Sequence, residues 1–233
     1  EYADRLNQLP LSVIGAAMGT ALLPMLSKQI RLTDFDVAHK TQNLAIEYAM
    51  TLAMPAMLAL MFLAYPISKT VFQFGKLTPH DTMQIAYTVM AFALGTPAYI
   101  LIKIFSTVFF AHHNTKAPVY VAILSVLVNL ALNLLLYRPF AHVGLAFSTA
   151  VSAWFNAGVL MTLLRKNNHL VLSERFKQFL PKLGLSCAMA MATIYVLSTY
   201  LWPLFDTGKT QQVIGLAILS ALVLAVYGIF CFL

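Results

Sequence analysis

Seven stretches of about twenty or more residues with almost no charge follow one another along this chain. A helix needs roughly 20 apolar residues to cross a bilayer, and each stretch is long enough. Lipid offers the backbone no hydrogen-bond partners, so spanning helices are expected, because a closed barrel would need shorter, alternating segments. The expected spans are 6–27, 48–68, 82–111, 117–137, 143–164, 183–205 and 210–233.

The composition favours an all-α polytopic membrane protein. Of the 233 residues, 60% are hydrophobic and 10% are charged, whereas soluble domains carry about 25% charged residues. We interpret the net charge of +7 as loop charge and expect no nucleic-acid partner. Cys187 and Cys231 stand alone in apolar segments, so neither a metal site nor a cofactor is expected.

The basic residues of the connecting segments predict the orientation. Seven alternating crossings place five Lys and Arg residues on one side and nine on the other, with Lys103 inside a span. Cytoplasmic loops carry the excess of positive charge, so the first helix is expected to run inward and the C-terminal end to be cytoplasmic. The nine are Lys28, Arg31, Lys40, Lys116, Arg165, Lys166, Arg175, Lys177 and Lys182.

The charged segment 167–182 is the best internal boundary. It separates five spans in residues 1–166 from a terminal pair in residues 183–233, and its mixture of charged and apolar residues suggests a short interfacial helix in the cytoplasmic linker. The chain begins without Met and ends in an apolar run. We therefore expect it to be a piece of a longer protein whose other part completes any shared site.

The acidic residues argue against catalysis in this chain. Enzymes that act on lipid phosphates usually need carboxylates, histidine clusters or a nucleophile pair, and no such group is expected at membrane depth here. The eight acids fall in expected loops or at span ends: Glu1, Asp4, Asp34, Asp36, Glu47, Asp81, Glu174 and Asp206.

Two basic side chains are candidates for binding an anionic group. Lys103 is the only charged residue between Thr82 and Ala111, and charged residues at membrane depth usually mark a substrate path. The alternative is a lysine that reaches toward the inner interface. Arg5 opens the first span, either as an interfacial anchor or, because a guanidinium forks onto phosphate, as a pyrophosphate ligand.

Small and polar residues suggest how the helices pack. Gly15 and Gly19 form a GxxxG pattern that permits close helix approach. Proline residues are expected to bend their helices, namely Pro24 together with Pro55 or Pro97.

Two polar strips lie on the fourth and fifth expected spans. Their residues either join helices by hydrogen bonds, the role we favour, or line a polar path. The first strip is Asn129 and Asn133, and the second is Ser148, Ser152 and Asn156.

Several motifs then resemble the MviN/MurJ family of lipid II flippases. "ADRLNQLPLSVIGAAMGTALLPMLSK" is similar to the family's arginine-bearing first motif, and "ILIKIFSTVFFAHHNTKAPV" to its lysine helix. "VFQFGKLTPHDT", "VNLALNLLL" and "HVGLAFSTAVSAWFNAGVLMTLLRK" follow in the family's order. The resemblance covers most of residues 2–166, and Asn7 stands where the family often has an aromatic residue.

The resemblance implies the second lobe and terminal helix pair of a fourteen-helix transporter, not an enzyme. Such a protein moves undecaprenyl-pyrophosphate-linked peptidoglycan precursor from the inner to the outer leaflet of the bacterial cytoplasmic membrane by alternating access. The resemblance also implies that Arg5 and Lys103 hold the diphosphate and head group, while the terminal helix pair forms a groove for the lipid tail. The expected partners are lipid II, membrane lipids and the N-terminal half.

Three other functions stay open at this point. One is export of another polyprenyl-linked glycan or a drug by the same superfamily, although drug exporters generally rely on membrane-embedded acids. The second is a membrane-embedded lipid-processing enzyme, which carboxylate pairs in a preceding half would favour. The third is a noncatalytic scaffold subunit of the cell-wall machinery.

Overall fold

The computed structural model describes residues 2–72, 78–200 and 209–232, and the regular elements in these ranges are α-helices. The predicted all-α polytopic fold is confirmed. In chain order the helices are α1 (Tyr2–Arg31), α2 (Phe35–Phe62), α3 (Ala64–Phe72), α4 (Pro79–Ala93), α5 (Thr96–Ala111), α6 (Lys116–Lys166), α7 (Glu174–Tyr200) and α9 (Lys209–Phe232).

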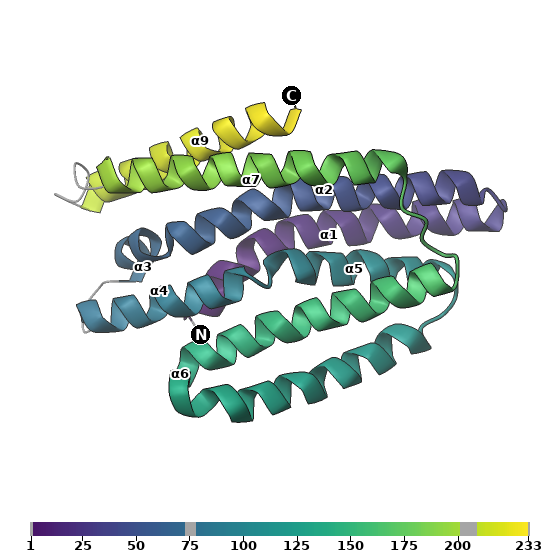
Figure 1. Ribbon diagram of the computed structural model, residues 1–233, viewed down its shortest axis with the longest axis horizontal. Coiled ribbons are helices and arrows are strands. Elements are labelled where there is room, and N and C mark those ends of the chain that lie inside the picture. Colours follow the sequence, from purple (N-terminus) through teal and green to yellow (C-terminus); the bar gives the residue numbers. More distant parts are fainter. Residues whose placement is uncertain (1, 73–77, 201–208, 233) are drawn as a thin grey trace.

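The crossings agree with the expected spans once α6 is recognised as a hairpin. Six helical stretches of the described residues are long and apolar enough to cross a membrane, with α4 and α5 together forming one of them. A straight helix of the 51 residues in α6 would measure about 77 Å, more than twice the thickness of a bilayer core. Figure 1 shows α6 folded into two arms instead, which accounts for the seventh crossing.

The turn of α6 depends on one strained residue and one glycine. Ala141 has φ 44° and ψ −123°, far from helical values. Gly144 comes so close to the first arm that a Cβ there would lie 2.5 Å from the carbonyl oxygen of Leu136. The two arms therefore pack together where Gly144 has no side chain.

The break between α4 and α5 occurs at one of the expected prolines. Gly95 separates the two helices, and Pro97 lies in the first turn of α5. The indole nitrogen of Trp154 in the second arm of α6 donates a hydrogen bond of 2.9 Å to the carbonyl of Leu94. α1 and α2 continue without interruption through Pro24 and Pro55.

The largest core lies among α1, α2, α5 and α6, and alanines form much of it. Small side chains let helix backbones approach closely, which is how helices gain van der Waals contact in lipid. Ala49, Ala53, Ala98, Ala153 and Ala157 are all buried there. α1 packs along α5 and α2, while α5 packs against α6.

The terminal pair, α7 and α9, packs against α2 and α3. Leu183, Ile194 and Leu219 are buried in this second core, together with Leu58 of α2. α7 begins at Glu174, so the second half of the expected linker is part of this long helix. Figure 1 shows α7 lying beside α2, and α9 packs against α7 as well as against α2 and α3.

The linker that precedes α7 is bonded to α2 through Asn43. This buried amide donates to the carbonyl of Val171 at 2.7 Å and accepts from the backbone N–H of Ser173 at 3.1 Å. A side chain thus supplies partners to backbone groups that no helix satisfies.

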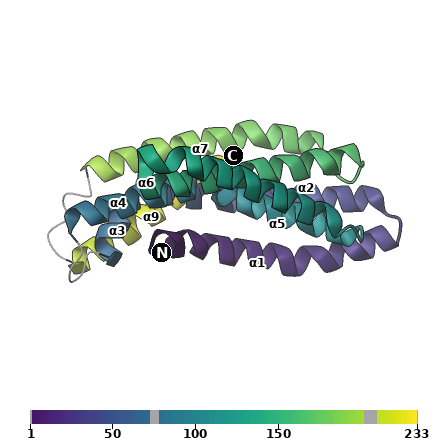
Figure 2. The ribbon, with the colours of Figure 1, turned by 90° about the horizontal axis from the view of Figure 1, so that it is seen from below.

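Three connections lie at the same end of the molecule: the α1–α2 turn, the α5–α6 turn and the α6–α7 linker (Figures 1 and 2). The imidazole rings of His112 and His169 stack there, with centroids 3.9 Å apart. The Nδ1 atom of His169 is buried and has no hydrogen-bond partner among the described residues. Burial, followed by the proximity of His112 and His39, lowers the pKa of His169 below its usual value.

Acidification is therefore expected to destabilise this end of the molecule. A histidine whose pKa is lowered by folding binds fewer protons than in the unfolded chain, so the free energy of unfolding falls as pH drops below the ordinary pKa of about 6.5. The measurement is the thermal unfolding midpoint of the intact protein in lipid nanodiscs at neutral and mildly acidic pH. His169→Gln should flatten this dependence, and His142→Gln, at an exposed position, should not. An unchanged dependence in His169→Gln contradicts the prediction.

Candidate functional site

The side chain of Lys103, from α5, lies against α1 at Gly15. A Cβ added to Gly15 would lie 2.6 Å from the Nζ atom of Lys103 and 2.7 Å from its Cδ atom. Such distances are shorter than van der Waals contact, so only glycine leaves room for the lysine in this arrangement. The first glycine of the GxxxG pattern thus accommodates a side chain of α5, and the lysine as a whole remains exposed in this chain.

Arg5 is also exposed and belongs to the same helix as Gly15. Ten residues of α-helix separate the two positions, which corresponds to about 15 Å along the axis. The backbone positions of Arg5 and of the Gly15–Lys103 contact therefore lie at two levels of the α1–α5 pair.

A buried hydrogen bond that the sequence did not predict joins α1 to α5 near Arg5. The Oγ1 atom of Thr96 donates to the Oδ1 atom of Asn7 at 2.5 Å, and both side chains are buried. The only sequence signal for this bond was that Asn7 stands where the family often has an aromatic residue. With this bond and the contact at Gly15, α1 and α5 are held in register at two points.

The two polar strips predicted from the sequence meet each other between the arms of α6. Asn129 donates to Ser152 at 3.3 Å and to Thr149 at 3.4 Å, while Asn133 donates to Asn129 at 3.0 Å. The hydroxyl of Ser148 donates to Asn133. These hydrogen bonds join the two arms, which is the role that we favoured for the strips.

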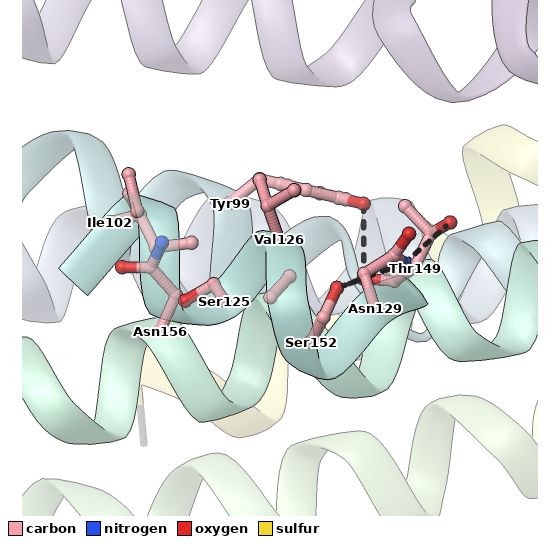
Figure 3. A pocket seen from close by; sticks show the side chains of 10 residues that line it. Tyr99, Ile102, Ser125, Val126, Asn129, Thr149, Ser152 and Asn156 are labelled. Atoms are coloured by element: carbon pink, nitrogen blue, oxygen red, sulfur yellow. Dashed lines mark hydrogen bonds between the residues drawn. The ribbon is translucent and has the colours of Figure 1, made fainter. Parts of the chain in front are cut away.

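Asn129, Thr149 and Ser152 of this cluster also line a groove of about 300 Å³ between α5 and the arms of α6. Figure 3 shows Tyr99, Asn129, Thr149 and Ser152 linked at one end of the groove, and Asn156 at the other. The Oδ1 atom of Asn156 is buried without a hydrogen-bond partner among the described residues. The strips therefore combine both expected features, hydrogen bonds between helices and a polar lining, and whether the lining has a role in transport stays a prediction.

The remaining packing candidates lie on α1. Pro24 is inside the helix, which continues to Arg31. Gly19 is part of the same helix, but its surroundings lie outside the described residues. Within the described residues, no group of three or more His, Cys, Asp or Glu side chains is arranged to hold a metal ion.

Comparison with known sequences points to a single protein family. The profile of the family described as "Lipid II flippase MurJ" matches residues 1–230. A "Probable lipid II flippase MurJ" of Rickettsia prowazekii (strain Madrid E) is 38% identical over 199 residues, which is 85% of this chain and 39% of that protein. The protein of the same description from Rhizobium tropici is 36% identical over 237 residues, or 100% of this chain and 44% of the relative.

Comparison of structures shows the same fold. A solved structure titled "Lipid II flippase MurJ, inward closed conformation" matches with a TM-score of 0.80 and 22% identity, over 97% of this chain and 45% of that chain. The chain thus spans less than half the length of these relatives. On the family profile and the sequence relatives together, the chain belongs to the lipid II flippase MurJ family.

Proposed function

We propose that this chain is the C-terminal part of a transporter that moves lipid II from the inner to the outer leaflet of the cytoplasmic membrane for cell-wall synthesis. Family membership supports the substrate class, since the relatives carry the name lipid II flippase. The observation that carries the proposal is the placement of Lys103 against Gly15, at membrane depth and beside the helix that bears Arg5.

Electrostatics explain why these two cations need a ligand or a water-filled cavity. A charged side chain at the centre of a bilayer costs roughly 3 kcal/mol or more if it faces lipid. Lys103 lies eight residues before the end of α5, or about 12 Å along the helix, so its side chain reaches the nearer interface only in part. We propose that a cavity shared with the N-terminal half of the protein hydrates both cations, and that the diphosphate and sugar head group of lipid II enters it.

Each cation has a distinct part in this proposal. The guanidinium of Arg5 makes the closer, forked contact with a phosphate, and the ammonium of Lys103 offsets the remaining negative charge. Residues 183–233, as the terminal helix pair, hold the long prenyl tail outside the polar cavity. Transport follows from rocking of the two lobes around the bound head group, without covalent chemistry.

Removing either cation is expected to weaken lipid II binding. Charged hydrogen bonds contribute about 1.5–3 kcal/mol, so Arg5→Ala and Lys103→Ala should each raise the Kd for lipid II by about ten-fold or more. Binding to the purified intact protein and growth complementation are the measurements, with membrane insertion and expression checked first. Full binding and complementation by both variants would disprove the electrostatic part of the proposal.

Gly15→Ala is expected to impair transport without unfolding the protein. The new methyl group displaces the flexible end of Lys103, which moves at little cost to packing, while alanine itself favours a helix. Growth complementation and thermal unfolding of the same preparation separate the two effects. Gly184→Ala is the matched control, because a Cβ there meets no atom within 4 Å. Equal transport by both variants contradicts a role for the lysine's position.

The C-terminal end is expected to be cytoplasmic. The nine basic residues counted above lie in the helix ends that flank the three connections at one end of the molecule, and positive charge is retained in the cytoplasm. Green fluorescent protein fused after Leu233 should fluoresce, and alkaline phosphatase fused there should be inactive. The reverse pair of results would invert the proposed topology.

A further inference from the structure

A buried carboxylate that the proposed transport does not use lies where α7 begins. Glu47 is only 6% exposed although it stands twelve residues inside α2, away from the span end at which the sequence placed it. Its Oε2 atom is 3.2 Å from the Nε atom of Arg175, whose own side chain is 73% exposed. Its Oε1 atom is buried and has no hydrogen-bond partner among the described residues. A buried carboxylate with one oxygen unsatisfied is costly unless a donor reaches it.

This carboxylate faces a hollow of about 220 Å³ between α2, α7 and α9. Four of the lining residues come from one face of α7, at the helical spacing i, i+3, i+4 and i+7. They are Arg175, Gln178, Phe179 and Lys182, and the lining is completed by Glu47 and Cys231. The hollow therefore combines one buried anion with two cations, an amide and an aromatic ring.

The position of the hollow along α7 is that of a membrane–water interface. α7 starts at Glu174, and its charged residues are confined to its first nine positions. Beyond them the helix carries no charged residue as far as the described residues extend, and the exposed Leu180 and Leu185 lie on either side of Lys182, where the apolar surface begins. A lipid whose acyl chains lie against these leucines would have its head group beside the hollow.

The charges of the hollow select among head groups. The Oε1 atom of Glu47 requires an N–H or O–H donor, whereas Arg175 and Lys182 attract a phosphate oxygen. A free phosphate or a phosphatidylglycerol head group offers no cation for Glu47 and brings a second negative charge toward it; the glycerol hydroxyls can donate a hydrogen bond but do not offset the charge of the carboxylate. A choline group carries positive charge but has no N–H donor. An ethanolamine phosphodiester supplies both the ammonium donor and the phosphate acceptor.

We propose that this hollow, named by Glu47, Arg175 and Lys182, binds the head group of a phospholipid with a primary ammonium, as in phosphatidylethanolamine. The ammonium donates to Glu47, and the phosphate lies between the two cations. The bound lipid then connects α2 to both terminal helices at their interfacial end. This inference concerns a membrane lipid outside the lobe cavity and is independent of lipid II transport.

The test measures the affinity of single lipids for the purified intact protein by native mass spectrometry. Phosphatidylethanolamine, its mono-, di- and trimethylated forms and phosphatidylglycerol are compared, all with the same acyl chains. For the wild-type protein, affinity should fall as methyl groups replace N–H donors, with a total loss of about ten-fold for the choline form. Equal affinity for the ethanolamine and choline forms, or tighter binding of phosphatidylglycerol, overturns the proposal.

Variants assign the selectivity to Glu47. Glu47→Gln should bind the ethanolamine and choline forms with nearly equal affinity, whereas Glu174→Gln, an exposed acid on α7 paired with Lys177, should keep the wild-type preference. Retention of the preference in Glu47→Gln overturns the assignment. If Glu47→Gln does not fold, the methylation series on the wild-type protein still decides the proposal. Lipid II binding, measured separately on the same preparations, reports on the proposed function alone.

Discussion

Lipid surrounds most of this chain, and lipid neither drives apolar helices together nor supplies hydrogen bonds to polar groups. The helices of this fold therefore associate through small side chains and a few buried polar contacts. Alanines form much of the core among α1, α2, α5 and α6. Three hydrogen-bonded contacts join separate helical segments: Asn7 with Thr96, Asn43 with the linker before α7, and Asn129 with Ser152.

The same constraint gives Lys103 its importance. An ammonium group among apolar residues needs contact with water or an anion. The side chain of Lys103 lies against α1 at Gly15, where a Cβ atom would occupy its place. Glycine at position 15 thus has a meaning that its motif alone does not reveal. In many membrane proteins a GxxxG pattern brings two backbones together, whereas here its first glycine receives a charged side chain of a neighbouring helix.

Much of this architecture follows from the sequence because hydrophobic length and charge spacing are strong signals in membrane proteins. The spans, the break near Pro97 and the position of Lys103 inside a span were all predictable. The contact between Lys103 and Gly15 was not, since it depends on the relative rotation of α1 and α5. The burial of Glu47 was also missed, because an acid at the edge of an apolar stretch does not reveal that α2 begins twelve residues earlier. The stacking of His112 and His169 joins turns 57 positions apart, and no local pattern indicates it.

The hydrogen bonds from Asn43 to the segment before α7 bear on how the two groups of helices move. These bonds anchor the linker at its α7 end, so the start of α7 is tied directly to α2. In the proposed mechanism, a tilt of α2 would carry α7 and α9 with it, which would keep the terminal helix pair aligned with the lobe.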